Sequence, residues 1–111
     1  MNMKKMLKEA QRLQQKMQVD AERASEQLAG ERLEGSSGGG LVTVVVNGHK
    51  QLISISIKPE AVDPEDVETL EDLVFAATQS ALSAAEARNS EVMEAVQSAN
   101  MPSGMGGMFG M

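Results

Sequence analysis

Apolar residues recur every three or four positions through the first quarter of the chain, which is the spacing of one helix face. On an ideal helical wheel at about 100° per residue they fall within an arc of about 120°. The pattern predicts a long amphipathic helix from about Asn2 to Leu28, and we assign residues 1–29 to an N-terminal helical arm. The apolar positions are Met3, Met6, Leu7, Ala10, Leu13, Met17, Ala21, Ala24 and Leu28.

The pattern then changes to two β-branched runs, residues 41–46 and 52–57, with Asn47-Gly48 between them. Asn-Gly tolerates the positive φ of a type I′ turn and is a strong hairpin signal. A two-residue turn would place Val46 opposite His49 and Val42 opposite Ile53. One face of the hairpin, which we expect to form the core or a dimer contact, then carries Val42, Val44, Val46, Ile53, Ile55 and Ile57.

The segment between the first helix and the hairpin is rich in glycine. Gly30 is expected to end the helix, and residues 31–34 are a candidate short first strand. Residues 35–40 lack the Lys-Ser/Thr of a phosphate-binding Walker loop and lead into a strand, so they are interpreted as a flexible connector. Residues 30–60 are therefore predicted to form the antiparallel sheet and dimer core.

A second long helix is predicted over residues 63–97, where Asp63 serves as N-cap and Pro64 occupies the first helical position. Leu70, Leu73 and Val74 are expected to pack on the sheet or at the dimer contact. Residues 98–111 form a Gly/Met-rich tail, which is expected to be disordered on its own.

These elements define an α+β fold with a long N-terminal helix, a two- to three-stranded antiparallel sheet and a long C-terminal helix. A chain of 111 residues with only two phenylalanines and no other aromatic residue has a thin core. Two helix segments do not easily cover such a sheet, so a symmetric dimer is the economical arrangement.

Charge is sorted along the chain, although the net value of −6 argues at first against a nucleic-acid partner. Residues 1–23 hold six bases and three acids, residues 24–59 hold three of each, and residues 60–111 hold one base and ten acids. The local field near the N-terminus is therefore positive. The six bases on the predicted first helix are Lys4, Lys5, Lys8, Arg12, Lys16 and Arg23.

These bases lie on the wheel nearly opposite the apolar arc. Lys4, Lys8, Arg12 and Lys16 follow one another at four-residue spacing, so their side chains form a slanting row. Such a row is typical either of a solvated charged face or of a surface that follows a phosphate backbone. The methionines of the first helix likewise fit either plain packing or an adaptable surface for a protein partner.

Enzymatic and metal-binding classes find no support in the residues. The single histidine, His49, sits beside a predicted turn, and the chain has no cysteine. Acids such as Glu65, Asp66 and Glu68 are expected in the first turns of a helix, where they favour its dipole. We expect no catalysis, metal, cofactor or small-molecule substrate. No stretch reaches the about 20 apolar residues of a membrane span, so no membrane association is expected.

Several motifs occur together in an order that resembles the YbaB/EbfC family of bacterial nucleoid-associated proteins. The chain shares with that family a Lys/Met/Gln-rich opening and a Gly/Met-rich tail. Its central matching segments are Gly38-Gly-Gly-Leu-Val42, Val45-Val-Asn-Gly48, Ile55-Ser-Ile57 and Asp63-Pro-Glu-Asp-Val-Glu-Thr-Leu-Glu-Asp-Leu73.

The resemblance implies a homodimer whose sheets join and whose helices project like tweezers. It also implies a cytoplasmic, nucleoid-located protein that binds double-stranded DNA with little sequence preference. Such binding would alter DNA conformation and would affect gene expression, nucleoid organisation and DNA protection. DNA contact is carried over to the six bases of the first helix. The second helix departs from the family pattern, because Ser83-Ala-Ala85 replaces lysines and only Arg88 follows.

The alternative hypothesis is a structural or adaptor protein. In that case the long helices would form oligomers or bind protein partners, as the acidic second half and the methionine stripe suggest.

Overall fold

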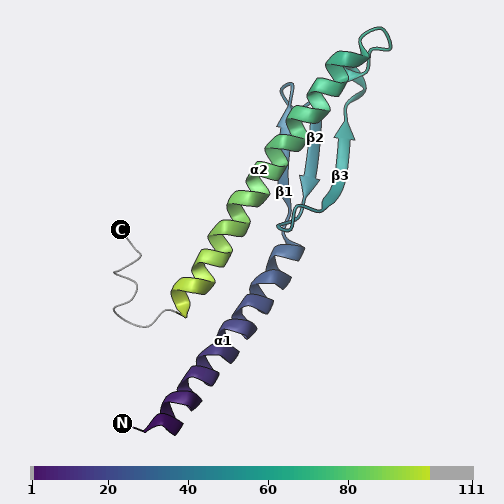
Figure 1. Ribbon diagram of the computed structural model, residues 1–111. Helices are drawn as coiled ribbons and strands as arrows, with labels where there is room; N and C mark the ends of the chain where they lie inside the picture. Colours follow the sequence, from purple (N-terminus) through teal and green to yellow (C-terminus); the bar gives the residue numbers. More distant parts are fainter. Residues whose placement is uncertain (1, 101–111) are drawn as a thin grey trace, which may run out of the picture. The chain divides into compact units, whose positions relative to one another are not determined.

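The computed structural model describes residues 2–100 and confirms the α+β architecture (Figure 1). The elements follow in the order α1 (Met3–Gly30), β1 (Leu33–Ser37), β2 (Val42–Val46), β3 (Leu52–Ile57), the 3-10 helix η1 (Pro59–Ala61) and α2 (Val67–Ala99). Of the predicted tail, residues 98 and 99 belong to α2, and residues 101–111 lie outside the described residues.

The chain divides into two compact units. The sheet unit comprises Leu28–Ser90, and the arm unit combines residues up to Gln27 with residues from Glu91 onward. In the arm unit Ala24 and Val92 are buried.

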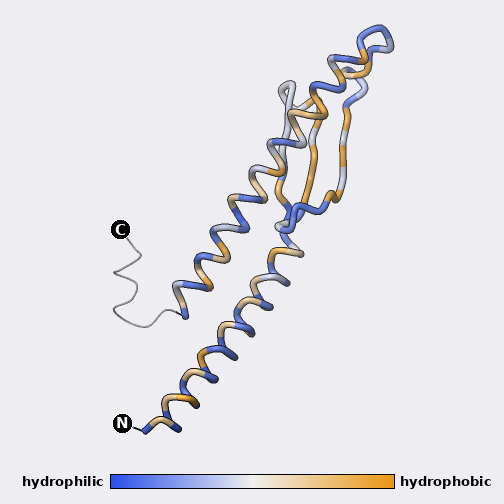
Figure 2. Tube along the Cα trace, in the orientation of Figure 1, coloured by the Kyte–Doolittle hydropathy of each residue, from blue (hydrophilic) through white to orange (hydrophobic). Residues whose placement is uncertain are grey.

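The sheet unit is a three-stranded antiparallel meander in the order β1-β2-β3. Its core forms where small residues let α2 approach the sheet (Figure 1). The valines at alternate positions of β2 are almost fully buried, as the two-residue period of a strand requires. Figure 2 shows this apolar character along β2 and β3. The fully buried cluster is Val42, Val44, Val46, Ala77, Ala81 and Ala85, with Leu33, Leu70, Leu73, Val74 and Leu82 packed against it.

The first strand begins later and extends further than the sequence predicted. It runs through Gly35 to Ser37, where we expected a strand at 31–34 followed by a connector. The reason is a close helix–strand approach. A Cβ on Gly35 would clash with the backbone nitrogen of Ala81 and the backbone oxygen of Ala77. Glycine thus belongs to the strand because the backbone of α2 occupies the place of a side chain.

The predicted two-residue hairpin is wrong. Val42 pairs with Ile57 instead of Ile53, and a bulge at Val45/Val46 brings Leu52 opposite Val46. The shift from Ile53 to Ile57 is four positions, and side chains alternate with period two. The predicted face is therefore retained where Val42 and Val44 pair with Ile57 and Ile55, despite the wrong register. Ile53 lies in the bulge and has no partner in this register.

A buried asparagine explains the longer loop at residues 47–51. Asn47 is 3% exposed, and its Oδ1 accepts hydrogen bonds from the backbone nitrogens of His49 (2.9 Å) and Gln51 (3.0 Å). The Gly48 nitrogen donates to the Leu28 oxygen at 2.8 Å. Lys50 adopts the positive φ, 64°. Contact with the end of α1 thus favours a loop that the local Asn-Gly signal does not predict.

The predicted N-cap of the second helix is also wrong, because α2 begins at Val67 rather than after Asp63. Asp66 caps it, since its Oδ1 accepts from the Thr69 nitrogen (3.3 Å) and its Oδ2 from the Thr69 hydroxyl (2.7 Å). Asp63 instead accepts from the Glu65 nitrogen at 3.0 Å and closes the preceding turn.

Candidate nucleic-acid interface

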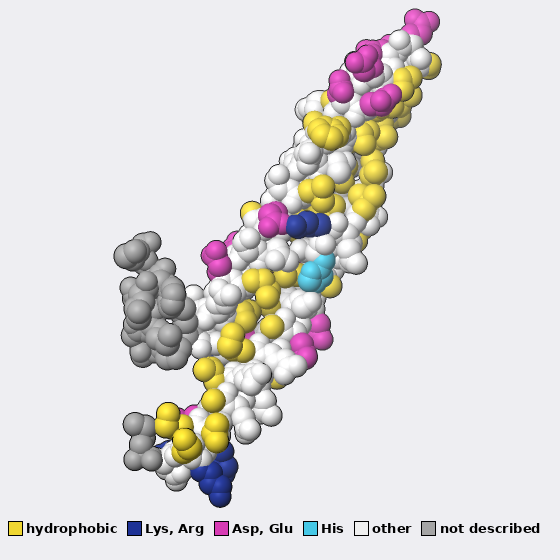
Figure 3. All heavy atoms as spheres, in the orientation of Figure 1, with side chains coloured by type: hydrophobic (Ala, Val, Ile, Leu, Met, Phe, Trp, Pro, Cys, Tyr) yellow, Lys and Arg dark blue, Asp and Glu magenta, His cyan; other side chains and the backbone are white. Residues whose placement is uncertain are grey.

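The basic side chains of α1 are all exposed. The helix carries most of its apolar residues on one arc, and the opposite arc holds the bases together with Val19. Figure 3 shows Lys and Arg side chains gathered on the N-terminal part of this helix. The residues concerned are those expected from the sequence: Lys4, Lys5, Lys8, Arg12, Lys16 and Arg23.

The positive charge is concentrated in the first two-thirds of α1. Residues 2–19 hold five bases and one acid, Glu9. Within residues 2–100, none of the ion pairs involves Lys4, Lys5, Lys8 or Arg12. Each four-residue step along the row advances about 6 Å, so the row from Lys4 to Lys16 is about 18 Å long. Its members from Lys4 to Arg12 present charged nitrogens that are available to an external anion.

Lys16, at the end of this row, has protein partners. Its Nζ lies 3.1 Å from Asp20 Oδ2 and 3.1 Å from Asn100 Oδ1. The Asn100 amide nitrogen donates to the same Asp20 oxygen at 3.1 Å and to the Val96 oxygen at 2.8 Å. Hydrogen bonds from Asn100 and Lys16 lower the pKa of Asp20 below its usual value. We call Lys16, Asp20 and Asn100 the polar clamp.

Sequence reasoning missed this clamp. The four-residue spacing of Lys16 and Asp20 was a usable signal for their ion pair. No sequence signal pointed to Asn100. It follows Lys16 by 84 positions and Asp20 by 80, and only the tertiary structure brings it beside them.

The basic face weakens beyond Lys16. Arg23 is exposed, but its charge contributes to the lowered pKa of Asp20, so an acid lies near it. Glu22 and Glu26 follow on the same side of the wheel as the bases. The strongest part of the candidate interface is therefore the segment from Lys4 to Arg12.

Arg88, the one base on the predicted second arm, is engaged by an acid in the sheet unit. Its Nη2 lies 2.7 Å from Glu31 Oε1 and its Nε 2.8 Å from Glu31 Oε2. Lys50 likewise pairs with Glu86 on α2. These cations already neutralise acids and offer little to a phosphate.

Acidic side chains gather at the start of α2 (Figure 3). They include Glu65, Asp66, Glu68, Glu71 and Asp72, all exposed. Among residues 2–100 there is no group of three or more His, Cys, Asp or Glu side chains arranged to hold a metal ion. Over the same range, no helix has the length and apolar character to cross a membrane.

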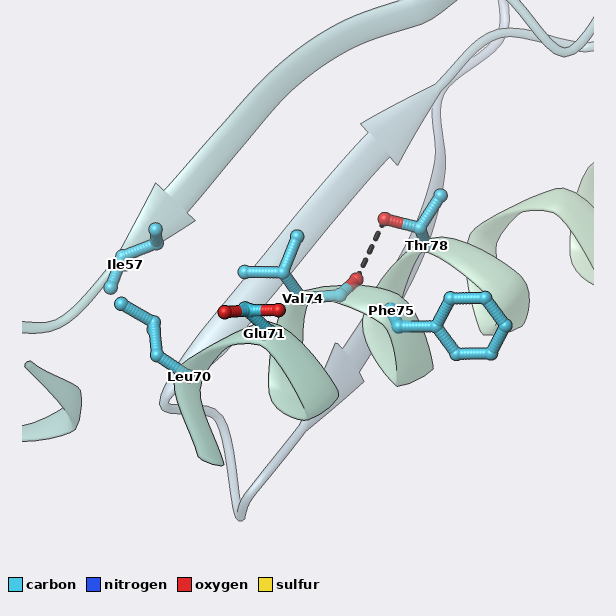
Figure 4. A pocket seen from close by; sticks show the side chains of 6 residues that line it. All are labelled: Ile57, Leu70, Glu71, Val74, Phe75 and Thr78. Atoms are coloured by element: carbon cyan, nitrogen blue, oxygen red, sulfur yellow. Dashed lines mark hydrogen bonds between the residues drawn. The ribbon is translucent and has the colours of Figure 1, made fainter. Parts of the chain in front are cut away.

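An open apolar groove lies between β3 and α2 within the sheet unit (Figure 4). Its volume is about 490 Å³. Ile57 and Leu70 point toward one another across it, and the Thr78 hydroxyl is satisfied by the Val74 oxygen at 2.7 Å. Phe75, which sequence reasoning did not select, is 66% exposed at its margin. The lining residues are Ile57, Leu70, Glu71, Val74, Phe75 and Thr78.

Residues 1–101 match a protein family described as the YbaB/EbfC DNA-binding family. A nucleoid-associated protein of Bacillus cereus strain B4264 is 48% identical over 87 residues, which cover 78% of this chain and 80% of the relative. A nucleoid-associated protein of Bacillus thuringiensis strain Al Hakam is 48% identical over 84 residues, covering 75% and 77%.

The fold is also similar to the crystal structure of an uncharacterized protein from Helicobacter pylori. The TM-score is 0.53 at 21% identity, over 88% of this chain and 91% of the other. At that identity the likeness concerns the fold alone.

Proposed function

This chain belongs to the YbaB/EbfC DNA-binding family, and from that premise we propose that it binds double-stranded DNA as a homodimer through the basic face of α1. The names of its relatives support a nucleoid-associated role in the cytoplasm. Binding in this mode would alter DNA conformation and thereby affect nucleoid organisation, gene expression and DNA protection. The proposal includes no catalytic step.

The observation that carries the proposal is the row of exposed cations on α1. Lys4, Lys8 and Arg12 stand one helical turn apart without an ion pair among the described residues. Neutralising DNA phosphates releases condensed counterions, and that release drives binding. A free cation provides this gain in full, whereas Lys16 would first have to leave Asp20.

Low sequence preference follows from the chemistry of the same row. Phosphate contacts position a protein on the duplex but do not distinguish base pairs. Lysine ammonium groups on long side chains act as point charges, and no aromatic residue accompanies them on α1 to stack on bases. We therefore propose that DNA is recognised mainly by its charge.

The homodimer is supported by apolar surface that the sheet unit leaves open. Ile55 and Ile57 remain 46% and 41% exposed although they pair with the buried Val44 and Val42, and Ile53 beside them is 45% exposed. β3 is also an edge strand, and the groove beside it is continuous with this surface. Exposed apolar patches of this kind mark association sites. The proposed contact surface consists of Ile53, Ile55, Ile57, Leu70, Val74 and Phe75.

A gel-shift titration on unrelated duplexes tests the proposal. The variant Lys4→Glu/Lys8→Glu/Arg12→Glu is compared with wild type and with Arg32→Glu/Lys50→Glu/Lys58→Glu, which changes net charge equally but lies in the sheet unit. Circular dichroism and size-exclusion chromatography first establish that all three proteins fold and assemble alike.

We expect wild type and the sheet-unit variant to shift DNA and the α1 variant to lose at least tenfold in affinity. If six to ten phosphates are neutralised per dimer, wild-type affinity should fall by about 10³ to 10⁵ between 50 and 200 mM salt. An equal loss of DNA affinity in both variants would show that the DNA-binding site does not lie on α1. A complex insensitive to salt would refute the electrostatic mechanism, and no shift by wild type would favour the adaptor alternative.

A further inference from the structure

The N-terminal part of α1 has an apolar face that is open at Met3, Met6 and Leu7 and partly covered at Leu13 and Met17. Met3, Met6 and Leu7 are 78%, 53% and 62% exposed, and Leu13 and Met17 are 38% and 41% exposed. These five residues, which we call the α1 stripe, share the arc opposite the basic row. A contiguous apolar surface of this kind calls for a partner.

The polar clamp determines where the chain continues after α2. Asn100 is 6% exposed and is bound to both Lys16 and Asp20 of α1. Asn100, the last described residue, therefore lies beside the C-terminal end of the α1 stripe. All of these residues belong to the same compact unit.

The composition of residues 101–111 suits an apolar surface. The segment has no charged residue, and five of its eleven side chains are large and apolar: Met101, Met105, Met108, Phe109 and Met111. Methionine side chains are flexible and adapt to irregular apolar surfaces. The glycines between them add little steric hindrance.

The reach of the segment is sufficient. Eleven extended residues span up to about 36 Å. The α1 stripe, from Met17 back to Met3, extends about 21 Å at the helical rise per residue. A tethered segment also acts at a millimolar effective concentration, which favours it over a free partner of similar chemistry.

We propose that residues 101–111 bind along the α1 stripe of their own chain and cover its methionine and leucine side chains. The basic row lies on the opposite arc and stays open to DNA when the segment is bound. In this proposal residues 101–111 shield the α1 stripe from solvent. This inference does not depend on DNA binding, and its tests use no DNA.

Crosslinking is straightforward because the chain has no cysteine. Met6→Cys/Phe109→Cys places one thiol on the α1 stripe and one in the tail. Lys8→Cys/Phe109→Cys is the matched control, because residue 8 lies about 160° away from residue 6 on the wheel. Both full-length proteins are oxidised at low micromolar concentration, and products are separated on non-reducing gels and identified by mass spectrometry.

We expect intrachain disulfide to form at least fivefold faster in the Met6 pair than in the Lys8 pair. Equal rates would overturn the proposal. Disulfide only between two chains would overturn it as well and would assign the stripe to a second copy.

Methionine oxidation provides a test without introduced thiols. Dilute peroxide oxidises accessible methionines to sulfoxides. In full-length Met108→Ser/Phe109→Ser, Met3 and Met6 should oxidise several-fold faster than in wild type. Met93 on α2, which is 38% exposed, is the internal control and should keep its rate. Unchanged rates at Met3 and Met6 would contradict the proposal.

Discussion

The Arg88 guanidinium is held by the Glu31 carboxylate through contacts of 2.7 and 2.8 Å. The two side chains are 30% and 23% exposed, and they join α2 to the segment between α1 and β1. Paired contacts between a guanidinium and a carboxylate are among the stronger hydrogen bonds in proteins. Arg88 therefore acts within the sheet unit, and it is not one of the six bases to which the sequence assigned DNA contact.

Arg88→Ala is expected to lower the free energy of unfolding by about 1–2 kcal/mol, since it removes a partly buried charged hydrogen-bond pair. The slope of the logarithm of DNA affinity against the logarithm of salt concentration, which we call the salt slope, should stay unchanged. Arg12→Ala should have little effect on the free energy of unfolding. It should reduce the magnitude of the salt slope of DNA binding by about two per dimer, because each chain loses one phosphate contact. Urea unfolding and salt-dependent titrations measure the two effects, and a reduced slope in Arg88→Ala would show that this residue contacts DNA.

The polar clamp should respond to acid. The folded-state pKa of Asp20 is below the usual 3.8, so its stabilising contribution is complete above that value and is lost as pH falls through the lowered folded pKa. Because the Asn100 hydrogen bond is the main cause, Asn100→Ala should raise the pKa of Asp20. An NMR titration of the Asp20 carboxyl carbon in both proteins measures this. An identical pKa in the variant would contradict the clamp.

Gly35→Ala should be strongly destabilising. The added methyl group would meet the backbone of Ala77 and Ala81, which cannot rotate away. Overpacking of this kind costs about 1–3 kcal/mol. Gly30→Ala is the matched control, because nothing lies within 4 Å of a Cβ at that helix terminus. Thermal and urea unfolding should show Gly35→Ala to be clearly less stable than Gly30→Ala. Similar stabilities of the two variants would refute the close helix–strand approach.

Ile55→Asp should dissociate the proposed dimer. A carboxylate placed within an apolar contact loses hydration without gaining a partner. We expect at least about a 100-fold rise in the dimer Kd, which corresponds to about 2.7 kcal/mol. Ser56→Asp adds the same charge on the opposite face of β3 and should leave the dimer intact. Light scattering across a dilution series measures both, and an undisturbed Ile55→Asp dimer would place the contact elsewhere.

Local patterns alone predicted both helices and two of the three strands of this protein. The 3.6-residue period specified both helices, the alternation in residues 41–46 and 52–57 specified two strands, and charge sorting marked the bases of α1. The shared face of Val42, Val44, Ile55 and Ile57 was predicted even through an incorrect register, since a shift of four positions preserves side-chain alternation.

Tertiary contacts decided the rest. Asn47 and Gly48 form a longer loop because they meet the end of α1, and Gly35 enters a strand because α2 packs on it. Asn100, which bonds Lys16, and Glu31, which bonds Arg88, lie 84 and 57 positions away along the chain. The sequence by itself determined which side chains carry charge and on which face they stand. Only the fold decided that Lys50 and Arg88 are already neutralised, because their acidic partners Glu86 and Glu31 are remote in the chain.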